Sequence, residues 1–299
     1  MIGAGLLEAL RERGIRTVSH QPLAPLSTIR IGGVAELAVF PASGEEAAFT
    51  LDRFRATGTP FRVVGNGSNL LFGDGILEGA LLVTRDMSRM EWSGDRLYAD
   101  CGVSLSGLSA SAAKEGYSGL EFARGIPGSL GGAVVMNAGA YGGAMSDIVT
   151  ESIAYDLRTG ETVTLTDHGF GYRQSVYLSH SELVCLGVVI RLKKGIREEI
   201  EAVMREYTRS RKEKQPLEYP SAGSYFKRPE GYFAGKLIED CGLKGYRIGN
   251  AAVSEKHAGF LINLGGATAE DVLRLEEYVR NRVRDRFGVE LEREVQVML

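Results

Sequence analysis

The chain has 299 residues, of which 44% are hydrophobic and 24% are charged, and this is typical of a globular protein with two or three domains. A formal net charge of −3 argues against nucleic acid as a general partner. Three widely spaced cysteines and four scattered histidines form neither a zinc-binding pattern nor a disulfide framework, so we expect no metal site.

The first residues of the chain are not typical of a signal peptide. They carry Glu8, Arg11, Glu12 and Arg13, and they contain no continuous apolar segment. No apolar run in the chain is long enough to span a bilayer. We therefore expect a cytoplasmic protein without a membrane partner.

The N-terminal part of the sequence predicts short helices and strands. Ser43 followed by Glu46 is typical of a capping box and predicts a helix that ends near Gly58. The other expected elements are a helix over 3–13, an extended segment over 22–33, and strands over 34–40 and 61–64.

The strand over 61–64 ends at the sequence Gly65-Asn66-Gly67-Ser68-Asn69-Leu70-Leu71. This loop lacks the lysine of a P-loop, and it lacks the third glycine and the following helix of a Rossmann turn. Its backbone N–H groups, hydroxyl and amides could still bind a diphosphate without a lysine. A plain tight turn is the alternative, which the loop alone favours. Beside the second glycine-rich stretch, the loop favours a ligand site.

That second stretch, Gly119–Asp147, combines many glycines with small apolar residues and carries almost no charge after Arg124. Glycine lets main-chain N–H groups reach a ligand directly, which favours one wall of a cofactor site. A glycine-rich core crossing between closely packed strands explains the same composition. The stretch alone does not separate these two interpretations.

Strands and one helix are expected around the second stretch. Thr159-Gly160 predicts a hairpin turn between two of the strands. The expected elements are strands over 80–84, 97–100, 151–157, 161–165 and 183–192, and a helix over 104–115. Residues 1–195 are therefore expected to form one α+β region.

The composition changes near residue 196, where a strongly charged helix over 196–215 is expected. Thr268 and Gly288 predict the two ends of a last helix. The remaining expected elements are a helix over 232–241 and strands over 251–253, 260–263 and 290–298. Residues 196–299 are therefore expected to form a second, smaller α+β domain.

Six sequence blocks follow one another in this order: Ser27–Gly33, Gly65–Leu71, Gly119–Asp147, Phe170–Ser175, Ala222–Pro229 and Leu291–Val295. Any one of them is weak evidence. All six, in order and over nearly the whole chain, resemble the UDP-N-acetylenolpyruvoylglucosamine reductase family.

The resemblance implies an α+β fold with an FAD-binding region of the vanillyl-alcohol-oxidase (PCMH) type and a C-terminal substrate-binding domain. The FAD-binding region would have two subdomains, over about 1–85 and 86–195. The resemblance also implies non-covalent FAD and NADPH as hydride donor. The reaction would reduce the enolpyruvyl ether of UDP-N-acetylglucosamine enolpyruvate to UDP-N-acetylmuramate in peptidoglycan precursor synthesis. A short segment between Tyr172 and Leu183 indicates the branch of the family that lacks a long tyrosine-bearing loop.

Three residues match the family's catalytic positions. The resemblance implies that Arg173 neutralises the developing enolate, that Ser224 donates a proton to the carbanion, and that Glu294 lies beside the substrate carboxylate with a raised pKa. Lys227 is a candidate positive neighbour of Ser224. Without the resemblance, an ion-pairing arginine, a turn serine and a solvent-facing glutamate are the preferred interpretations.

The resemblance also implies binding residues. For the FAD diphosphate, the expected residues are Gly65, Asn66, Gly67, Ser68, Asn69 and Leu70. For the flavin and adenosine, they are Gly125, Ile126, Pro127, Gly128, Ser129, Gly132, Asn137, Ala138, Gly139 and Ala140, with Arg30 and Ile31 in a block near the cofactor. For the nucleotide sugar, they are Lys214, Tyr225, Lys227 and Asn263. His257 is expected to be structural.

Two other functions remain open from the residues. A flavin oxidase of the same cofactor fold would use dioxygen, and it would not require Arg173, Ser224 and Glu294 together. The second alternative is a regulator that binds a sugar nucleotide and has lost catalysis. The presence of all three candidate catalytic residues argues against it. The expected partners are the enolpyruvyl nucleotide sugar and NADPH, and the expected assembly is a monomer or a weak oligomer.

Overall fold

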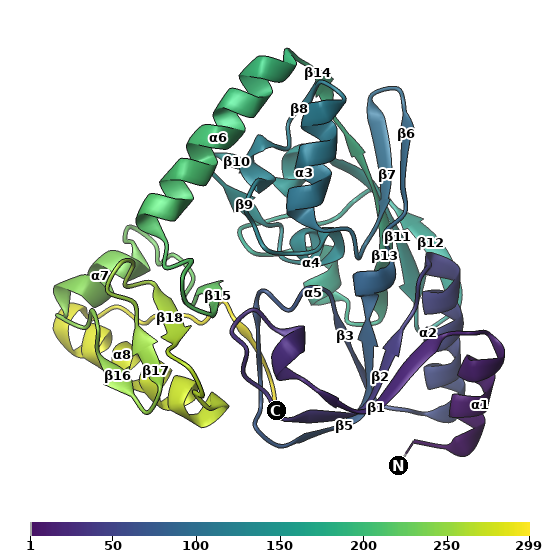
Figure 1. The fold of residues 1–299 in the computed structure, drawn as a ribbon, viewed down its shortest axis with the longest axis horizontal. Coiled ribbons are helices and arrows are strands. Elements are labelled where there is room, and N and C mark those ends of the chain that lie inside the picture. Colours follow the sequence, from purple (N-terminus) through teal and green to yellow (C-terminus); the bar gives the residue numbers. More distant parts are fainter. Residues whose placement is uncertain (1) are drawn as a thin grey trace. The chain divides into compact units, whose positions relative to one another are not determined.

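Residues 2–299 are described in a computed structural model, and they divide into two compact units that are each discontinuous in sequence (Figure 1). The first unit contains the chain up to His20, then Glu36–Asn66 and Glu78–Arg209. The second contains Gln21–Ala35, Gly67–Leu77 and Ser210–Leu299. The expected functional boundary near residue 196 stays a prediction.

The first unit is built mainly of strands, with short helices between them. Its helices are α1 (Ala4–Glu12), α2 (Gly44–Thr57), α3 (Leu105–Lys114), α4 (Leu130–Val135) and α5 (Val176–Ser179), with 3₁₀ turns η2 (Thr84–Asp86), η3 (Glu121–Ala123) and η4 (Met145–Asp147). Its longer strands are β1 (Arg16–Pro22), β2 (Val34–Phe40), β3 (Phe61–Val64), β5 (Ile76–Val83), β6 (Met90–Ser93), β7 (Arg96–Asp100), β11 (Val149–Asp156), β12 (Glu161–Leu165) and β13 (Leu183–Arg191). Its two-residue strands are β8 (Tyr117–Ser118), β9 (Gly139–Ala140), β10 (Gly143–Ala144) and β14 (Lys193–Lys194).

Two sheets organise these strands. One has the order β1-β2-β5-β3, in which β3 and β5 run parallel, and the other is antiparallel with the order β12-β11-β13-β7-β6. The helices α2, α4 and α5 all pack against β13. The core between them is apolar, with Leu51, Leu97 and Val188 fully buried.

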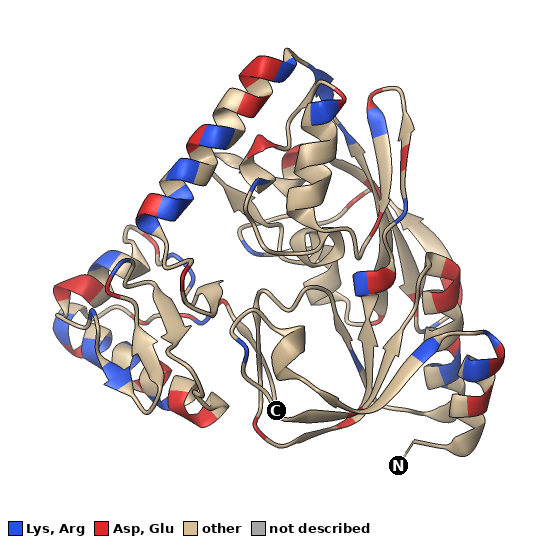
Figure 2. Cartoon of the chain, viewed as in Figure 1, with Lys and Arg blue, Asp and Glu red and all other residues tan. Residues whose placement is uncertain are grey.

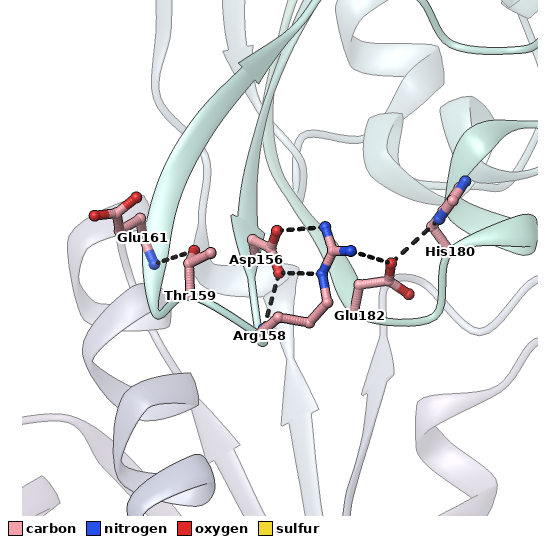
Figure 3. A network of polar contacts seen from close by, with 6 residues as sticks. All are labelled: Asp156, Arg158, Thr159, Glu161, His180 and Glu182. Carbon is pink, nitrogen blue, oxygen red and sulfur yellow. Dashed lines mark hydrogen bonds and ion pairs between the residues drawn. The ribbon is translucent and has the colours of Figure 1, made fainter.

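A polar network closes the hairpin between β11 and β12, which confirms the turn expected at Thr159-Gly160 (Figure 3). The guanidinium of Arg158 donates to both carboxylate oxygens of Asp156, at 3.2 and 2.9 Å, and lies 3.6 Å from Glu182. The hydrogen bond from Arg158 lowers the pKa of Asp156 below its usual range. The turn is therefore held by charge as well as by strand pairing.

The second unit contains a small antiparallel sheet with a long helix packed against it. Its elements are η1 (Ala24–Leu26), β4 (Leu70–Phe72), β15 (Ser221–Ser224), α7 (Ala234–Asp240), β16 (Arg247–Ile248), β17 (Ala251–Val253), β18 (Phe260–Asn263), α8 (Ala269–Phe287) and β19 (Gln296–Met298). The sheet order is β15-β18-β17-β16, and β19 pairs in parallel with β4. Ile29, Leu71 and Leu291 join Val272 and Val279 in one buried cluster, so three distant parts of the chain share this core.

The long helix α6 (Arg197–Lys214) carries both signs of charge along its length (Figure 2). This distribution agrees with a largely solvated helix, as its sequence predicts. Among residues 2–299, no helix combines the length and the apolar character that crossing a bilayer would require.

Local capping signals are largely confirmed. The Ser43 hydroxyl accepts a hydrogen bond from the Glu46 N–H at 3.2 Å, and the Glu46 carboxylate accepts from the Ala42 N–H rather than from Ser43. Thr268 and Asp271 form a full capping box for α8, which ends at Gly288 with φ +66°. The expected last strand is shorter than predicted and covers only β19.

Candidate functional site

Arg173 occupies a tight turn in the first unit. The Gly171 N–H donates to the Gln174 carbonyl at 3.1 Å, and the Gln174 N–H donates to the Gly171 carbonyl at 3.2 Å. Arg173 has φ +53°, which is costly for a residue with a side chain, and its guanidinium lies 5.2 Å from the centre of the Tyr172 ring. The turn therefore imposes a strained backbone on this arginine.

Positive φ values gather at predicted site residues. Among the described residues, the non-glycine positions with positive φ are His20, Arg30, Asn137, Tyr141 and Arg173. The sequence predicts three of these, Arg30, Asn137 and Arg173, as site residues. Strain of this kind persists only where the surrounding structure enforces it, and it often accompanies functional sites.

Hydrogen bonds hold the Arg173 turn on both sides. The Asn137 side chain donates from Nδ2 to the Gly171 carbonyl at 2.9 Å, and its Oδ1 accepts from the Ser146 N–H at 3.0 Å. After the turn, the Ser175 hydroxyl donates to the Val135 carbonyl at 2.6 Å. The turn is thus attached to the end of α4 and to the residues that follow it.

A buried polar group lies at the base of the same loop. The Ser152 hydroxyl is 2.9 Å from His168 Nε2 and 2.7 Å from the Tyr177 hydroxyl. The His168 carbonyl accepts from the Val176 N–H at 2.7 Å, and the His168 ring stacks on Phe170. Burial lowers the pKa of His168, so its neutral form belongs to the folded protein.

We expect the protein to lose stability between pH 7.5 and pH 5.5. Burial lowers the pKa of His168 and of His257, and the neutral His257 Nδ1 accepts a hydrogen bond from the Gly259 N–H at 3.1 Å. The unfolded chain protonates these rings near their ordinary pKa of about 6.5, and the folded protein does so only at lower pH. Their contribution is therefore complete above about pH 6.5 and is lost as the pH falls towards the lowered values. Tm measured across this range tests the expectation.

The matched controls are single substitutions. His168→Gln is expected to flatten the dependence of Tm on pH, and exposed His20→Gln is expected to leave it as it is. A wild-type Tm that does not fall on acidification would contradict this account of His168 and His257.

Some glycines of the second glycine-rich stretch allow close packing within the first unit. A Cβ on Gly131 would lie 2.7 Å from the Cys101 Cβ, and one on Gly143 would lie 2.8 Å from the Phe122 ring. Similarly, a Cβ on Gly139 would lie 2.7 Å from the Gly143 carbonyl oxygen. These positions fit the alternative of a tight core crossing, which the sequence left open.

Other positions of the stretch remain accessible. Gly125 is exposed with φ +83°, and Pro127 and Gly132 are exposed as well. Ser129 is buried at the start of α4, and its side chain occupies the space where Gly65 lacks a Cβ. The other predicted cofactor residues here are buried (Gly128) or half-buried (Ile126, Ala138, Gly139 and Ala140).

Arg85 holds the first part of the Gly65–Leu70 loop. Its guanidinium donates to the Gly65 carbonyl at 3.3 Å and to the Asn66 carbonyl at 3.1 Å. In a trans peptide the C=O and N–H groups point in opposite directions, so the N–H groups of Asn66 and Gly67 point away from Arg85. Burial lowers the pKa of Arg85, but an arginine in this environment stays charged near neutral pH.

The rest of the loop is held in the second unit by its carbonyl groups. The Gly67 carbonyl accepts from the Thr28 N–H at 3.1 Å, and the Asn69 carbonyl accepts from the Gln296 N–H at 2.9 Å. Asn69 Nδ2 also donates to the Glu294 carbonyl at 3.1 Å. Within residues 2–299, no backbone N–H from Gly65 to Asn69 donates a hydrogen bond to the protein.

These observations fit the diphosphate of FAD. The loop offers consecutive N–H donors with their carbonyls fixed on the other side, and this arrangement binds anions. The positive charge of Arg85 lies behind the first two peptides. The assignment of the diphosphate to Gly65, Asn66, Gly67, Ser68, Asn69 and Leu70 stays a prediction.

Gly67→Ala is expected to weaken FAD retention and lower Tm. Gly67 has φ +61°, and a Cβ there would lie 2.9 Å from the Leu26 carbonyl carbon and closer still to its oxygen. The left-handed backbone costs alanine about 1–2 kcal/mol, and relief of the clash must move the loop. The ratio of FAD to protein after gel filtration measures the effect. Gly75→Ala is the control, because a Cβ there meets nothing within 4 Å; equal FAD content in both variants would contradict the prediction.

In the second unit, a β-bulge places Ser224. Ser221 pairs with Ile262 and Ser224 pairs with Phe260, so β15 has one residue more than β18 between these pairs. Gly223 supplies the left-handed conformation, φ +79°, that this kind of bulge uses. Ser224 is exposed at the end of the strand.

Glu294 lies on the segment that runs beside the residues after Ser224. The Glu294 N–H donates to the Tyr225 carbonyl at 2.9 Å, and Phe226 and Arg293 form an isolated antiparallel bridge. The structure thus brings the Ser224 and Glu294 segments together within the second unit. The raised pKa expected for Glu294 stays a prediction.

Two residues predicted to bind the nucleotide sugar are already engaged within the second unit. Lys227 forms an ion pair with Glu292. Tyr225 is fully buried, and its hydroxyl donates to Glu276 at 2.9 Å. Burial raises the pKa of Tyr225, and Arg293 also donates to Glu276, at 3.1 Å. This burial does not favour direct contact between Tyr225 and a ligand.

Asn263 is buried and fastens the segment that carries Arg30. Its Nδ2 donates to the Ile29 carbonyl at 3.0 Å, and its Oδ1 accepts from the N–H groups of Gly265 and Ala267 at 2.8 and 3.1 Å. Arg30 is exposed, whereas Ile31 lies in the buried cluster. Lys214 is exposed at the end of α6.

Comparison with known proteins agrees with the fold. Residues 35–166 match the family model described as an FAD-binding domain. The chain is therefore an α+β FAD-binding protein, and the predicted fold class is confirmed. Residues 215–298 match the model of the UDP-N-acetylenolpyruvoylglucosamine reductase C-terminal domain.

Full-length relatives define the family further. A protein of Pediococcus pentosaceus named UDP-N-acetylenolpyruvoylglucosamine reductase is 43% identical, over 100% of this chain and 99% of that one. One with the same name from Caldanaerobacter subterraneus is 44% identical, over 93% of this chain and 92% of that one. The crystal structure of the Thermus caldophilus enzyme, MurB, aligns with a TM-score of 0.80 and 36% identity, over 95% of this chain and 99% of that one. The chain belongs to the UDP-N-acetylenolpyruvoylglucosamine reductase family, as the six sequence blocks predict.

Sequence reasoning missed Arg85 and His168. Arg85 follows a strand and belongs to no recognised motif, and only the folded chain brings it to Gly65 and Asn66. A buried position could have been suspected for His168, because it stands two residues before the Phe170–Ser175 block.

Proposed function

We propose that this chain reduces the enolpyruvyl ether of UDP-N-acetylglucosamine enolpyruvate to UDP-N-acetylmuramate, with FAD as cofactor and NADPH as hydride donor. The observation that carries the proposal is membership of the reductase family over the full length of the chain. The donor set of the Gly65–Leu70 loop supports the cofactor. This reaction belongs to peptidoglycan precursor synthesis.

When bound, FAD supplies hydride transfer from NADPH to the methylene carbon of the enolpyruvyl ether. Negative charge then develops on the neighbouring carbon and its carboxylate. Arg173 is the residue we assign to this charge, because a planar guanidinium matches a carboxylate in shape and sign. Hydrogen bonds hold the backbone of the turn that carries Arg173. We propose that this turn orients the guanidinium before the reaction, because donors placed in advance make electrostatic stabilisation effective.

Ser224 is the proposed proton donor to the carbanion. A hydroxyl is a weak acid in water, so the role requires a positive neighbour and exclusion of solvent. Lys227 lies on the same segment, and its ion pair with Glu292 would have to adjust if Lys227 is that neighbour. Glu294, on the adjoining segment, is proposed to contact the substrate carboxylate in its protonated form.

We assign the nucleotide sugar to the second unit, with Lys214 and Lys227 as candidate partners of its diphosphate. Asn263 is proposed to act by fastening the Ile29–Arg30 backbone rather than by direct contact. We also propose a functional division between residues 195 and 196 and the absence of the tyrosine-bearing loop. The proposed location is the cytoplasm, and the proposed assembly is a monomer or a weak oligomer.

A flavin oxidase of the same cofactor fold is the rival, and a steady-state assay separates the two. We expect yellow protein whose NADPH consumption depends on the enolpyruvyl nucleotide sugar, with UDP-N-acetylmuramate as product. Consumption of NADPH with dioxygen alone, at a rate that the nucleotide sugar does not change, would favour the oxidase.

A further inference from the structure

The strained turn that carries Arg173 is fastened to one short segment at the end of α4. Asn137 binds the Gly171 carbonyl ahead of Arg173, and Val135 accepts the Ser175 hydroxyl behind it. The two anchors are only two positions apart in the sequence. One short segment therefore holds both sides of the turn.

The carboxamide of Asn137 is committed to protein contacts. It is 9% exposed, its Nδ2 donates to Gly171 and its Oδ1 accepts from Ser146. The Gly171 carbonyl also accepts the Gln174 N–H, which closes the turn. A carbonyl oxygen has two acceptor sites. At Gly171, Asn137 Nδ2 occupies one of them and the Gln174 N–H occupies the other.

The backbone of Asn137 supports the same interpretation. Its φ of +40° is a conformation that asparagine adopts more readily than most residues with a side chain. Asparagine thus tolerates the positive φ at this position, and its side chain supplies both a hydrogen-bond donor and an acceptor. The sequence resemblance places this residue against the cofactor, but its side chain binds the arginine turn.

We infer that Asn137 is a positioning residue for Arg173: its amide holds the turn so that the guanidinium meets the charge that develops on the substrate. The inference rests on the proposed function of Arg173. Displacement of a catalytic group by about 1 Å can slow a reaction by about 10²-fold. Release of the Gly171 carbonyl should therefore affect the step that uses Arg173 more than flavin reduction.

Two substitutions separate the contacts of Asn137. Asn137→Asp keeps an acceptor for the Ser146 N–H, but it removes the donor and places a carboxylate opposite the Gly171 carbonyl. Asn137→Gly keeps the positive φ and removes both contacts. Asn281→Asp, on α8 of the second unit, makes the same charge change at an amide that accepts from Arg284, and it is the control.

The experiment measures both anaerobic half-reactions in each variant, together with FAD affinity. We expect both Asn137 variants to lower the ratio of flavin reoxidation by the enolpyruvyl substrate to flavin reduction by NADPH by about 10- to 100-fold. FAD affinity should change by less than about 3-fold, and the Asn281 control should keep the wild-type ratio. In an Arg173→Lys background, Asn137→Asp should cost less than about 3-fold, because the two residues act on one interaction.

Additive losses in the double variant, or weakened FAD binding with a wild-type ratio of half-reactions, would overturn the inference. Hydrogen exchange provides a readout that does not depend on the reaction. Amides of Gln174 and Val176 should exchange at least about 10-fold faster in Asn137→Asp, while β11 and β13 keep their protection. If wild-type flavin is not reoxidised by the substrate, the proposed function fails. The exchange of these amides then decides whether Asn137 holds the turn, and unchanged exchange would refute it.

Discussion

Replacement of Ser224 by alanine is expected to slow reoxidation of the flavin by the enolpyruvyl substrate by about 10²- to 10⁴-fold, which is the usual contribution of a positioned acid. Reduction of the flavin by NADPH should stay close to the wild-type rate, because that step needs no proton from Ser224. The bulge at Gly223 presents the hydroxyl at the exposed end of β15, and removal of one oxygen leaves the strand pairing intact.

Stopped-flow absorbance of the flavin measures the two steps separately. Ser221→Ala, on the same strand, is the matched control and should keep both rates. An equal loss of both rates in Ser224→Ala would count against the role of proton donor and would indicate damage to the cofactor site.

The second large effect is expected from Arg173→Lys. Lysine keeps the positive charge but loses the planar pair of donors, so the developing carboxylate would be held by a single mobile ammonium. We expect reoxidation to slow by about 10²- to 10³-fold at saturating substrate, as for removal of an oriented donor at a developing charge. The cost should appear in the rate of the step more than in substrate affinity, since the interaction strengthens as the charge forms.

Single-turnover rates over a range of substrate concentrations separate these two quantities. Arg158→Lys, in the hairpin network of the first unit (Figure 3), provides the control for an arginine-to-lysine change outside the Arg173 turn. Arg173→Lys could instead raise only the substrate concentration that gives half of the limiting rate and keep the limiting rate itself. Arg173 would then be a binding residue rather than a stabiliser of the developing charge.

Local signals in the sequence predicted local structure well. Ser43, Thr268 and Gly288 mark helix ends through hydrogen bonds that span a few residues, and these are present as predicted. The Thr159-Gly160 turn is also local. Such features depend on side chains and backbone within one turn, so a single sequence carries them.

The structure of the second glycine-rich stretch could not be predicted in this way. Its glycines disfavour a helix, yet α4 forms because Leu130, Ala133 and Val134 are buried and Gly131 packs closely on Cys101. Tertiary packing thus overrides local preference. The same packing accounts for several glycines that the sequence could equally assign to a ligand wall.

Local sequence signals also could not predict which segments of the chain form the second unit. Residues of the Gln21–Ala35 segment join it through long-range contacts, such as the Thr28 hydroxyl donating to the Ser221 carbonyl at 2.7 Å. The roles of Asn137 and Asn263 have the same origin, since each amide binds the backbone of a distant segment. The resemblance named both residues, but only the folded chain shows what their side chains contact.

The most direct test is an anaerobic titration of the purified yellow protein. One equivalent of NADPH should bleach the flavin absorbance, and one equivalent of UDP-N-acetylglucosamine enolpyruvate should then restore it and yield one equivalent of UDP-N-acetylmuramate. Flavin that stays bleached with the enolpyruvyl compound, yet recovers as soon as air is admitted, would contradict the proposed reductase.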